Sequence, residues 1–231
     1  MASDALIEIE TRKTISSKSP SSLSRILAEG VLLARWERTA LAGAEPGLKA
    51  LRLARGPVAI TTTSRQPADF HHQLCTLVPT AGPQERDSLR ILAEDACELA
   101  TIFAHISGRE HLRLRLERVE DDGCALFHVD TLPLRMVCTY SGPGTQWLEE
   151  DNVRRDQLGA RGRSLEEANA AIVVDPAKIQ TAPAWHVLLF KGRLWEGHGY
   201  YDGLVHRSAP VRHPRDHRLR LTVDYSNSCS C

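Results

Sequence analysis

The sequence predicts a mainly β fold of the α+β class, in which helices from the first half of the chain pack outside a sandwich or barrel of strands. Three observations indicate this fold. Apolar residues recur at helical spacing before Gly108, several short segments with strand-like alternation follow it, and no apolar run approaches the ~20 residues that span a bilayer. The length of 231 residues suits one domain with an N-terminal extension.

The charge balance of the chain bears on its partners. Lys and Arg together number 29, and Asp and Glu also number 29, so the formal net charge is zero. A protein that binds nucleic acid needs a basic face to replace the counterions of the phosphates, so we expect no nucleic-acid partner. The N-terminus has no basic start followed by an apolar stretch, and we therefore expect a cytoplasmic protein with no membrane partner.

The chain is expected to divide into four segments. Serine is frequent over residues 14–24, which predicts a mobile start to the chain. The expected order is a flexible N-terminal segment (residues 1–24), a helical part of the same domain (residues 25–110), a strand-rich core (residues 111–226) and a C-terminal tail (residues 227–231). The two cysteines of that tail, Cys229 and Cys231, could bind zinc or copper as thiolates, or the segment could be a frayed end.

Two stretches carry the helical pattern. The first covers residues 25–55, where Leu27, Val31 and Trp36 are spaced as on one helix face until Pro46 interrupts the pattern. The clearest helix spans residues 84–107. Its leucines and other apolar residues recur every three or four positions, and a glycine follows it as a stop signal.

The strand pattern begins after this helix. Leu112, Leu114 and Leu116 alternate with charged residues, as in a strand with one buried face. Five further strands are predicted, at residues 124–130, 134–140, 185–190, 204–208 and 218–225. A polar insertion over residues 141–184 separates two of them and contains a short helical pattern, SLEEANAAI.

Two histidines and an aspartate in the β half form a candidate metal site. If residues 124–130 are a strand, His128 and Asp130 point to the same face, because side chains alternate along a strand. His206, 76 residues after Asp130, could supply a third ligand from another strand. Two histidines and one carboxylate are the arrangement that leaves positions open on non-haem Fe(II).

A second cluster could bind a carboxylate. Arg218, Arg220 and Thr222 share one face of the last predicted strand. A guanidinium beside a hydroxyl can hold a carboxylate through two parallel hydrogen bonds, and Arg220 with Thr222 fits this best. Tyr140 could line the same cavity, and Trp147 and Trp195 are candidates for its substrate-facing wall, together with the polar insertion.

The order of these motifs resembles the Fe(II)/2-oxoglutarate-dependent oxygenases of the prolyl-hydroxylase-like kind. The shared order is H-x-D, an LLF strand, H-x-x-x-P and R-x-T, over about residues 111–225. The resemblance implies a double-stranded β-helix of the jelly-roll or cupin type as the core. It also implies Fe(II) and 2-oxoglutarate as cofactors.

The resemblance assigns roles to five residues: His128, Asp130 and His206 as iron ligands, Arg220 as the partner of the distal carboxylate of 2-oxoglutarate, and Thr222 as its assistant. One departure affects the co-substrate. The 14 residues from His206 to Arg220 make a long spacing, so Arg218 stays open for the same role.

Three long motifs, FHVDTLPLRMVCTYSGPGTQWL, LLFKG and LVHRSAP, are similar to the bacterial family called domain of unknown function 1826, over most of the chain. This likeness supplies no activity, so several functions stay open. The first is an oxygenase that hydroxylates an unidentified substrate, either a small molecule or a protein side chain. The alternative is a non-catalytic β-barrel protein that binds zinc through the same three ligands. A structural β-barrel without a metal is the third.

Overall fold

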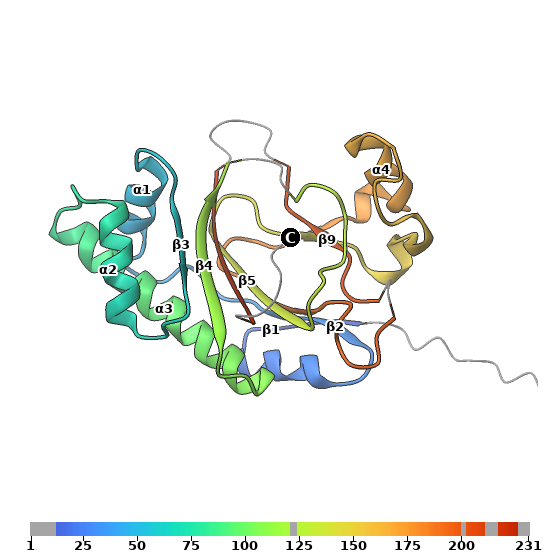
Figure 1. Ribbon diagram of the computed structural model, residues 1–231, viewed down its shortest axis with the longest axis horizontal. Coiled ribbons are helices and arrows are strands. Elements are labelled where there is room, and N and C mark those ends of the chain that lie inside the picture. The colour runs from blue at the N-terminus through green and yellow to red at the C-terminus, as the bar shows by residue number, and fades with distance from the viewer. Residues whose placement is uncertain (1–12, 121–123, 200–201, 211–216, 226–231) are drawn as a thin grey trace, which may run out of the picture.

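The computed structural model describes residues 13–120, 124–199, 202–210 and 217–225 (Figure 1). Its largest element is a seven-stranded sheet with the order β1-β2-β8-β5-β10-β4-β3. Neighbouring strands are antiparallel, except that β1 runs parallel to β2. The strands are β1 (Lys13–Ser17), β2 (Val31–Trp36), β3 (Ala59–Thr62), β4 (Leu112–Val119), β5 (Leu134–Ser141), β8 (Val187–Lys191) and β10 (Arg218–Tyr225).

A second, three-stranded sheet carries part of the candidate site. Its order is β7-β6-β9, with β6 at Gln146–Trp147, β7 at Gln180–Thr181 and β9 at His206–Arg207. β6 pairs antiparallel with β9, which places Trp147 opposite His206. The described part of the chain is therefore a mixed α+β structure with one large, mostly antiparallel sheet and one small sheet.

Helices α1, α2 and α3 lie together along the outer side of the large sheet, and α4 lies apart from them on the opposite side of the molecule (Figure 1). The α-helices are α1 (Glu45–Leu53), α2 (Pro67–Leu77), α3 (Pro83–Ser107) and α4 (Leu165–Ile172), and the 3₁₀ helices are η1 (Pro20–Leu27), η2 (Glu150–Asn152), η3 (Arg155–Gln157) and η4 (Pro176–Lys178). α3 begins with a proline, whose missing N–H would have no partner within the helix at that position. It ends at Ser107 and is followed by Gly108, which adopts a left-handed φ of 65° as the C-cap. Its buried stripe, including Leu92, Leu99 and Phe103, packs into the main core.

The two faces of β5 and β10 differ in chemistry, and this difference positions the site. On β5, Leu134, Met136 and Cys138 belong to the core beneath the helices. On β10, Leu219, Leu221 and Val223 do the same. The alternate residues of both strands therefore point to the opposite, polar side of the sheet, because neighbouring side chains in a strand face opposite ways.

Several sequence predictions are confirmed. The helix predicted over residues 84–107 is α3, and the short helix in the polar insertion is α4. The strands predicted at residues 134–140 and 218–225 are β5 and β10. The shorter predictions at residues 185–190 and 204–208 correspond to β8 and β9.

No helix in the described ranges has both the length and the apolar character to cross a membrane.

Other predictions are wrong in detail. Residues 25–55, predicted as helical, contain strand β2. Val31 and Ala34 pack into one core, and Leu32 and Leu33 pack into another. Because both faces of this strand are apolar, its apolar residues imitate helical spacing. The serine-rich start contains β1 and η1. Residues 124–130 are not a strand, and their one ladder contact is the bridge between His128 and His206.

Candidate functional site

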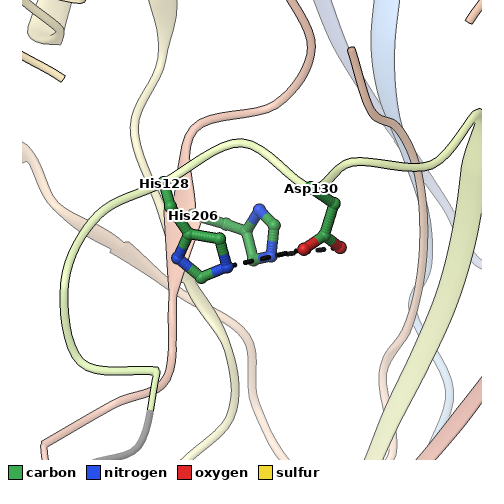
Figure 2. Close-up of side chains that lie close together, drawn as sticks. All are labelled: His128, Asp130 and His206. Atoms are coloured by element: carbon green, nitrogen blue, oxygen red, sulfur yellow. Dashed lines mark ion pairs between the residues drawn. The ribbon is translucent and has the colours of Figure 1, made fainter. Parts of the chain in front are cut away.

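His128, Asp130 and His206 meet in space, as the sequence predicts (Figure 2). One ligand atom from each lies within 4.8 Å of the other two. The Nε2 atom of His128 lies 3.5 Å from Oδ1 of Asp130, and Nε2 of His206 lies 3.6 Å from Oδ2 of the same carboxylate. Both imidazoles therefore turn the same ring nitrogen toward one carboxylate.

The backbone brings the two histidines together. His128 donates its N–H to the carbonyl of His206, and His206 donates its N–H to the carbonyl of His128, each at 3.0 Å. These two hydrogen bonds form the antiparallel bridge between the segment after Cys124 and strand β9. The rings lie 4.6 Å apart between centroids, and the ring of His206 also lies 4.5 Å from that of Phe190 on β8. Phe190 thus packs against the ring of His206 from strand β8.

Local hydrogen bonds select the tautomer of both rings. Nδ1 of His128 lies 2.8 Å from the carbonyl of Leu126, and Nδ1 of His206 lies 3.1 Å from the carbonyl of Leu204. A carbonyl oxygen only accepts, so each Nδ1 carries a proton and donates it. In the neutral ring the lone pair is then on Nε2, the nitrogen that faces Asp130, which is the arrangement found where histidine binds a metal.

Asp130 is held rigidly at the centre of the site. Asp130 as a whole residue is 1% exposed. Its Oδ2 accepts a hydrogen bond of 2.8 Å from Nη1 of Arg135, while its Oδ1 is buried and accepts none among the described residues. Its backbone carbonyl accepts from the N–H of Arg193 at 3.0 Å. A Cβ at Gly192 would lie 2.7 Å from that carbonyl, so glycine allows the strand end to approach this closely.

The protonation states suit a cation site. Burial would raise the pKa of Asp130, but the two histidines and the guanidinium beside it outweigh burial and hold that pKa well below its usual range. Burial lowers the pKa of His206 to about 4, against the attraction of the carboxylate. Burial also lowers the pKa of His128, but its contact with Asp130 outweighs burial and raises it overall. At neutral pH the site thus offers an ionised carboxylate and a neutral His206.

These residues fit a divalent transition metal. The Nε2 atoms of both histidines and the Asp130 carboxylate converge on one region, and the buried Oδ1 of that carboxylate lacks a hydrogen bond among the described residues. A buried carboxylate oxygen without a partner is costly, and a bound cation removes that cost. His-Asp-His is a donor set for Fe(II) with open positions, and zinc accepts the same ligands.

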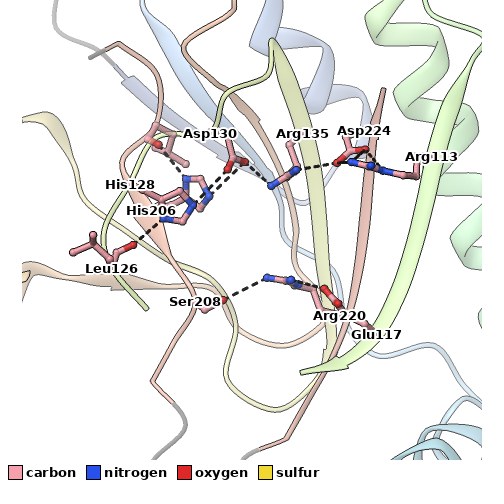
Figure 3. A network of polar contacts seen from close by, with 11 residues as sticks. Arg113, Glu117, Leu126, His128, Asp130, Arg135, His206, Ser208, Arg220 and Asp224 are labelled. Atoms are coloured by element: carbon pink, nitrogen blue, oxygen red, sulfur yellow. Dashed lines mark hydrogen bonds and ion pairs between the residues drawn. The ribbon is translucent and has the colours of Figure 1, made fainter. Parts of the chain in front are cut away.

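The site opens into a cavity of about 420 Å³ between the polar face of the large sheet and the segment that carries β9. The lining includes the three candidate ligands together with Arg220, Thr222 and Ser208. Arg220 donates from Nη1 to Ser208 Oγ at 3.4 Å and is ion-paired with Glu117 on β4 (Figure 3). The hydroxyl of Thr222 lies 3.5 Å from the carbonyl of Arg115. The arginine and the threonine thus face the same cavity as the metal ligands.

A chain of charges, not found from the sequence, links the candidate ligands to the large sheet (Figure 3). Arg135 on β5 donates to Asp130 and, from Nη2 at 2.9 Å, to Asp224 on β10. Arg113 on β4 donates to both oxygens of Asp224, at 2.9 and 3.1 Å. The alternation of side chains along a strand could have indicated these residues. Asp224 shares a face with Arg220 on β10, and Arg135 lies on the face of β5 opposite to its core residues.

Other residues singled out in the sequence lie elsewhere. Tyr140 does not line the cavity with Arg220, because it shares the core face of β5 and donates its hydroxyl to Asp95 on α3 at 2.7 Å. Arg218 is buried at the start of β10, outside the lining of the cavity. Trp147 packs in a second core and Trp195 against the main one, so neither lines this cavity. The Cys229–Cys231 tail lies outside the described residues.

Comparison with known proteins gives one family. The model of the family described as "Protein of unknown function (DUF1826)" matches residues 17–224. No curated protein sequence matches the chain.

Several solved structures align with most of the chain. A dioxygenase for auxin oxidation from rice aligns with a TM-score of 0.47 at 14% identity, over 91% of this chain and 81% of that one. Dioxygenase for auxin oxidation 1 from Arabidopsis thaliana, as its 2-oxoglutarate complex, gives 0.45 at 11%, over 91% and 90%. A prolyl-4-hydroxylase from Pseudomonas putida gives 0.42 at 12%, over 88% and 96%.

Proposed function

The chain belongs to the DUF1826 family, and we propose that it is an Fe(II)/2-oxoglutarate-dependent oxygenase-like protein that hydroxylates an unidentified substrate. One observation supports this above all. The Nε2 atoms of His128 and His206 converge with the Asp130 carboxylate, whose buried Oδ1 accepts no hydrogen bond from the described residues. They do so at a cavity whose wall also carries Arg220 and Thr222. A metal site and a carboxylate-binding group in one cavity are what an enzyme of this kind requires.

In this proposal each group has one task. His128, Asp130 and His206 hold Fe(II), and the Nδ1 hydrogen bonds keep both imidazoles in the ligating orientation. Arg220 and Thr222, which line the cavity, hold the distal carboxylate of 2-oxoglutarate. Fe(II) with 2-oxoglutarate and O₂ supplies the oxidant for C–H hydroxylation. The protein residues bind, orient and shield the reactants from water.

The proposal extends to the fold and the setting. The large and small sheets would be the two halves of a double-stranded β-helix, with α1, α2 and α3 packed outside it. We propose a cytoplasmic enzyme whose substrate is a small molecule or a protein side chain, with no nucleic-acid or membrane partner. The balanced charge of the chain supports the absence of a nucleic-acid partner.

The test is thermal unfolding of metal-stripped protein under anaerobic conditions. Fe(II), Mn(II) or Zn(II) is added, each with and without 2-oxoglutarate. A ligand at 100 times its dissociation constant stabilises the fold by ~2.7 kcal/mol, which shifts the melting temperature measurably. We expect 2-oxoglutarate to add a further shift only when Fe(II) or Mn(II) is present. A shift with zinc alone, and none with 2-oxoglutarate, would overturn the oxygenase proposal.

A second function, non-catalytic zinc binding through the same three ligands, is favoured by one observation. Arg220, the proposed co-substrate anchor, is already ion-paired with Glu117 inside the cavity. Zinc needs no co-substrate, so this ion pair would not interfere with it. The unfolding experiment separates the two functions, because only the oxygenase predicts that 2-oxoglutarate adds to the stabilisation by Fe(II) or Mn(II).

A further inference from the structure

Arg220 and Glu117 are fixed partners across two strands. They are direct neighbours in the antiparallel register of β10 and β4. Nη2 of Arg220 donates to Oε1 of Glu117, and Nη1 reaches Ser208. Nε of the same guanidinium is buried and donates to none of the described residues. The guanidinium in the cavity therefore already has a carboxylate partner from the protein itself (Figure 3).

The hydrogen bond between Arg220 and Glu117 determines which donors of the guanidinium are open to a ligand carboxylate. A guanidinium holds a carboxylate with two parallel hydrogen bonds either from Nη1 and Nη2 or from Nε and Nη2, so Nη2 takes part in both arrangements. In this protein Nη2 is the donor that Glu117 engages. Nη2 carries two N–H groups, so a ligand carboxylate competes with Glu117 when it takes the arrangement that uses the N–H that Glu117 already occupies.

Glu117 has a second partner that it can keep. Its Oε2 accepts a hydrogen bond of 2.5 Å from Nη2 of Arg115, two residues away on β4. The side chain of Arg115 is 41% exposed, whereas those of Arg220 and Glu117 are 18% and 11% exposed. The carboxylate can thus release Arg220 while it remains paired with Arg115. That retained pair lowers the cost of the exchange, because Glu117 is not left as an unpaired buried charge.

We propose that Glu117 is an internal competitor for the carboxylate-binding arginine: it occupies Arg220 in the ligand-free protein and gives it up to a ligand carboxylate while staying on Arg115. This inference rests on the proposed function, in which Arg220 anchors the co-substrate. The consequence is selectivity. A carboxylate that binds Arg220 alone competes poorly with Glu117, whereas a dicarboxylate that also chelates the metal gains the second contact that displacement requires.

The experiment measures binding of glutarate, by calorimetry, to metal-stripped protein. Glutarate has two carboxylates but lacks the 2-oxo group that would chelate a metal. In Glu117→Gln the competing charge is absent and the side chain keeps its size. We expect this variant to bind glutarate about tenfold more tightly than the wild-type protein, the size expected for one hydrogen bond between charged groups.

Three further variants control the result. Glu120→Gln removes the same charge from a neighbouring side chain that lines the cavity but pairs with Arg118, so its glutarate affinity should match the wild type. Glu117→Asp keeps the charge on a shorter side chain and should give a smaller gain, which provides the test should Glu117→Gln fail to fold. The double variant Glu117→Gln with Arg220→Gln should lose the gain.

The outcomes separate this inference from the proposed function. Unchanged or weaker glutarate binding in both Glu117 variants, or an equal gain in Glu120→Gln, overturns the role of Glu117. Absence of any added stabilisation by 2-oxoglutarate in metal-loaded wild-type protein overturns the oxygenase. A gain in Glu117→Gln that depends on Arg220 supports the competitor even in that second case, because glutarate binding is measured without metal or turnover.

Discussion

Arg135 donates a hydrogen bond of 2.8 Å to Oδ2 of Asp130 and leaves Oδ1, buried beside His128, without a hydrogen bond from the described residues. The same guanidinium donates to Asp224 at 2.9 Å, which fixes its own position. The ion pair therefore decides which oxygen of the candidate ligand is available to a cation. It also ties the ligand to strands β5 and β10 of the large sheet.

Replacing Arg135 should weaken metal binding although Arg135 is not a ligand. Arg135→Lys keeps the positive charge but loses the planar fork that contacts two carboxylates, so Asp130 gains freedom to rotate. We expect the affinity for Mn(II) to fall about 10- to 100-fold, the usual effect of removing a partner of a metal ligand. Titration followed by electron paramagnetic resonance measures it. Arg113→Lys, which touches Asp224 but not Asp130, is the control, and equal losses in both would contradict a specific role for Arg135.

Asp130→Ala should abolish tight metal binding, because the two histidines alone offer no charge to balance the cation. We expect the loss to exceed about 100-fold, more than removal of a partner of a ligand causes. Metal content after dialysis against Fe(II) or Zn(II) is the measurement. Glu120→Gln removes a carboxylate from the same cavity and should keep the metal. Metal content in Asp130→Ala equal to the wild type would rule out the three-residue site.

Arg220→Ala should separate co-substrate binding from metal binding. Arg220 touches none of the three candidate ligands in the described contacts, so Mn(II) affinity should stay within about twofold, whereas loss of a charged hydrogen bond weakens 2-oxoglutarate by about tenfold or more. Both affinities are measured by calorimetry. Arg218→Ala is the matched variant. Normal 2-oxoglutarate binding in Arg220→Ala, with weakened binding in Arg218→Ala, would move the anchor to Arg218.

Tyr140→Phe should lower stability without affecting the co-substrate. The Tyr140 hydroxyl donates to Asp95, which also pairs with Arg38 at 2.5 Å beneath the helices. Loss of one buried hydrogen bond to a charged group costs about 1.5–3 kcal/mol, measured by urea unfolding. The affinity for 2-oxoglutarate should equal that of the wild type. A weaker affinity at unchanged stability would contradict the placement of Tyr140 on the core face of β5.

Alkaline pH should destabilise the fold through two buried thiols. Burial raises the pKa of Cys138 from 9.0 to about 12 and that of Cys97 from 9.0 to about 11. As pH rises above 9, the unfolded chain loses these protons while the folded chain keeps them, so the free energy of unfolding falls. The slope is at most about 1.4 kcal/mol per pH unit for each thiol. Urea unfolding from pH 8 to 11 measures it.

Cys138→Ala provides the comparison for the alkaline effect. This variant has one titrating thiol fewer, so its free energy of unfolding should fall less steeply above pH 9 than that of the wild type. The variant will be less stable at every pH, because a buried side chain is truncated. The slope with pH is therefore the relevant quantity. A variant slope equal to the wild-type slope would show that Cys138 ionises alike in the folded and unfolded chain.

Local patterns in the sequence were sufficient for the long elements and for the three candidate ligands. Helix α3 repeats its apolar residues every three or four positions from Leu89 to Ile106. Apolar residues recur at every second position over most of β4, β5 and β10, so local backbone geometry predicts these elements. The His-x-Asp motif and the distant His206 were found from their chemistry and order. They meet although residues 124–130 are not a strand, because the bridge between His128 and His206 aligns them.

Only the tertiary structure decided which partners these residues have. Tyr140 and Arg135 both lie on β5, and the packing of α3 against one face of that strand sends the tyrosine to the core and the arginine to the cavity. The pairing of Glu117 with Arg220 depends on the register between β4 and β10, which are about 100 residues apart in the chain. Register and facing are long-range properties, set by the burial of whole strands, so no local pattern contains them.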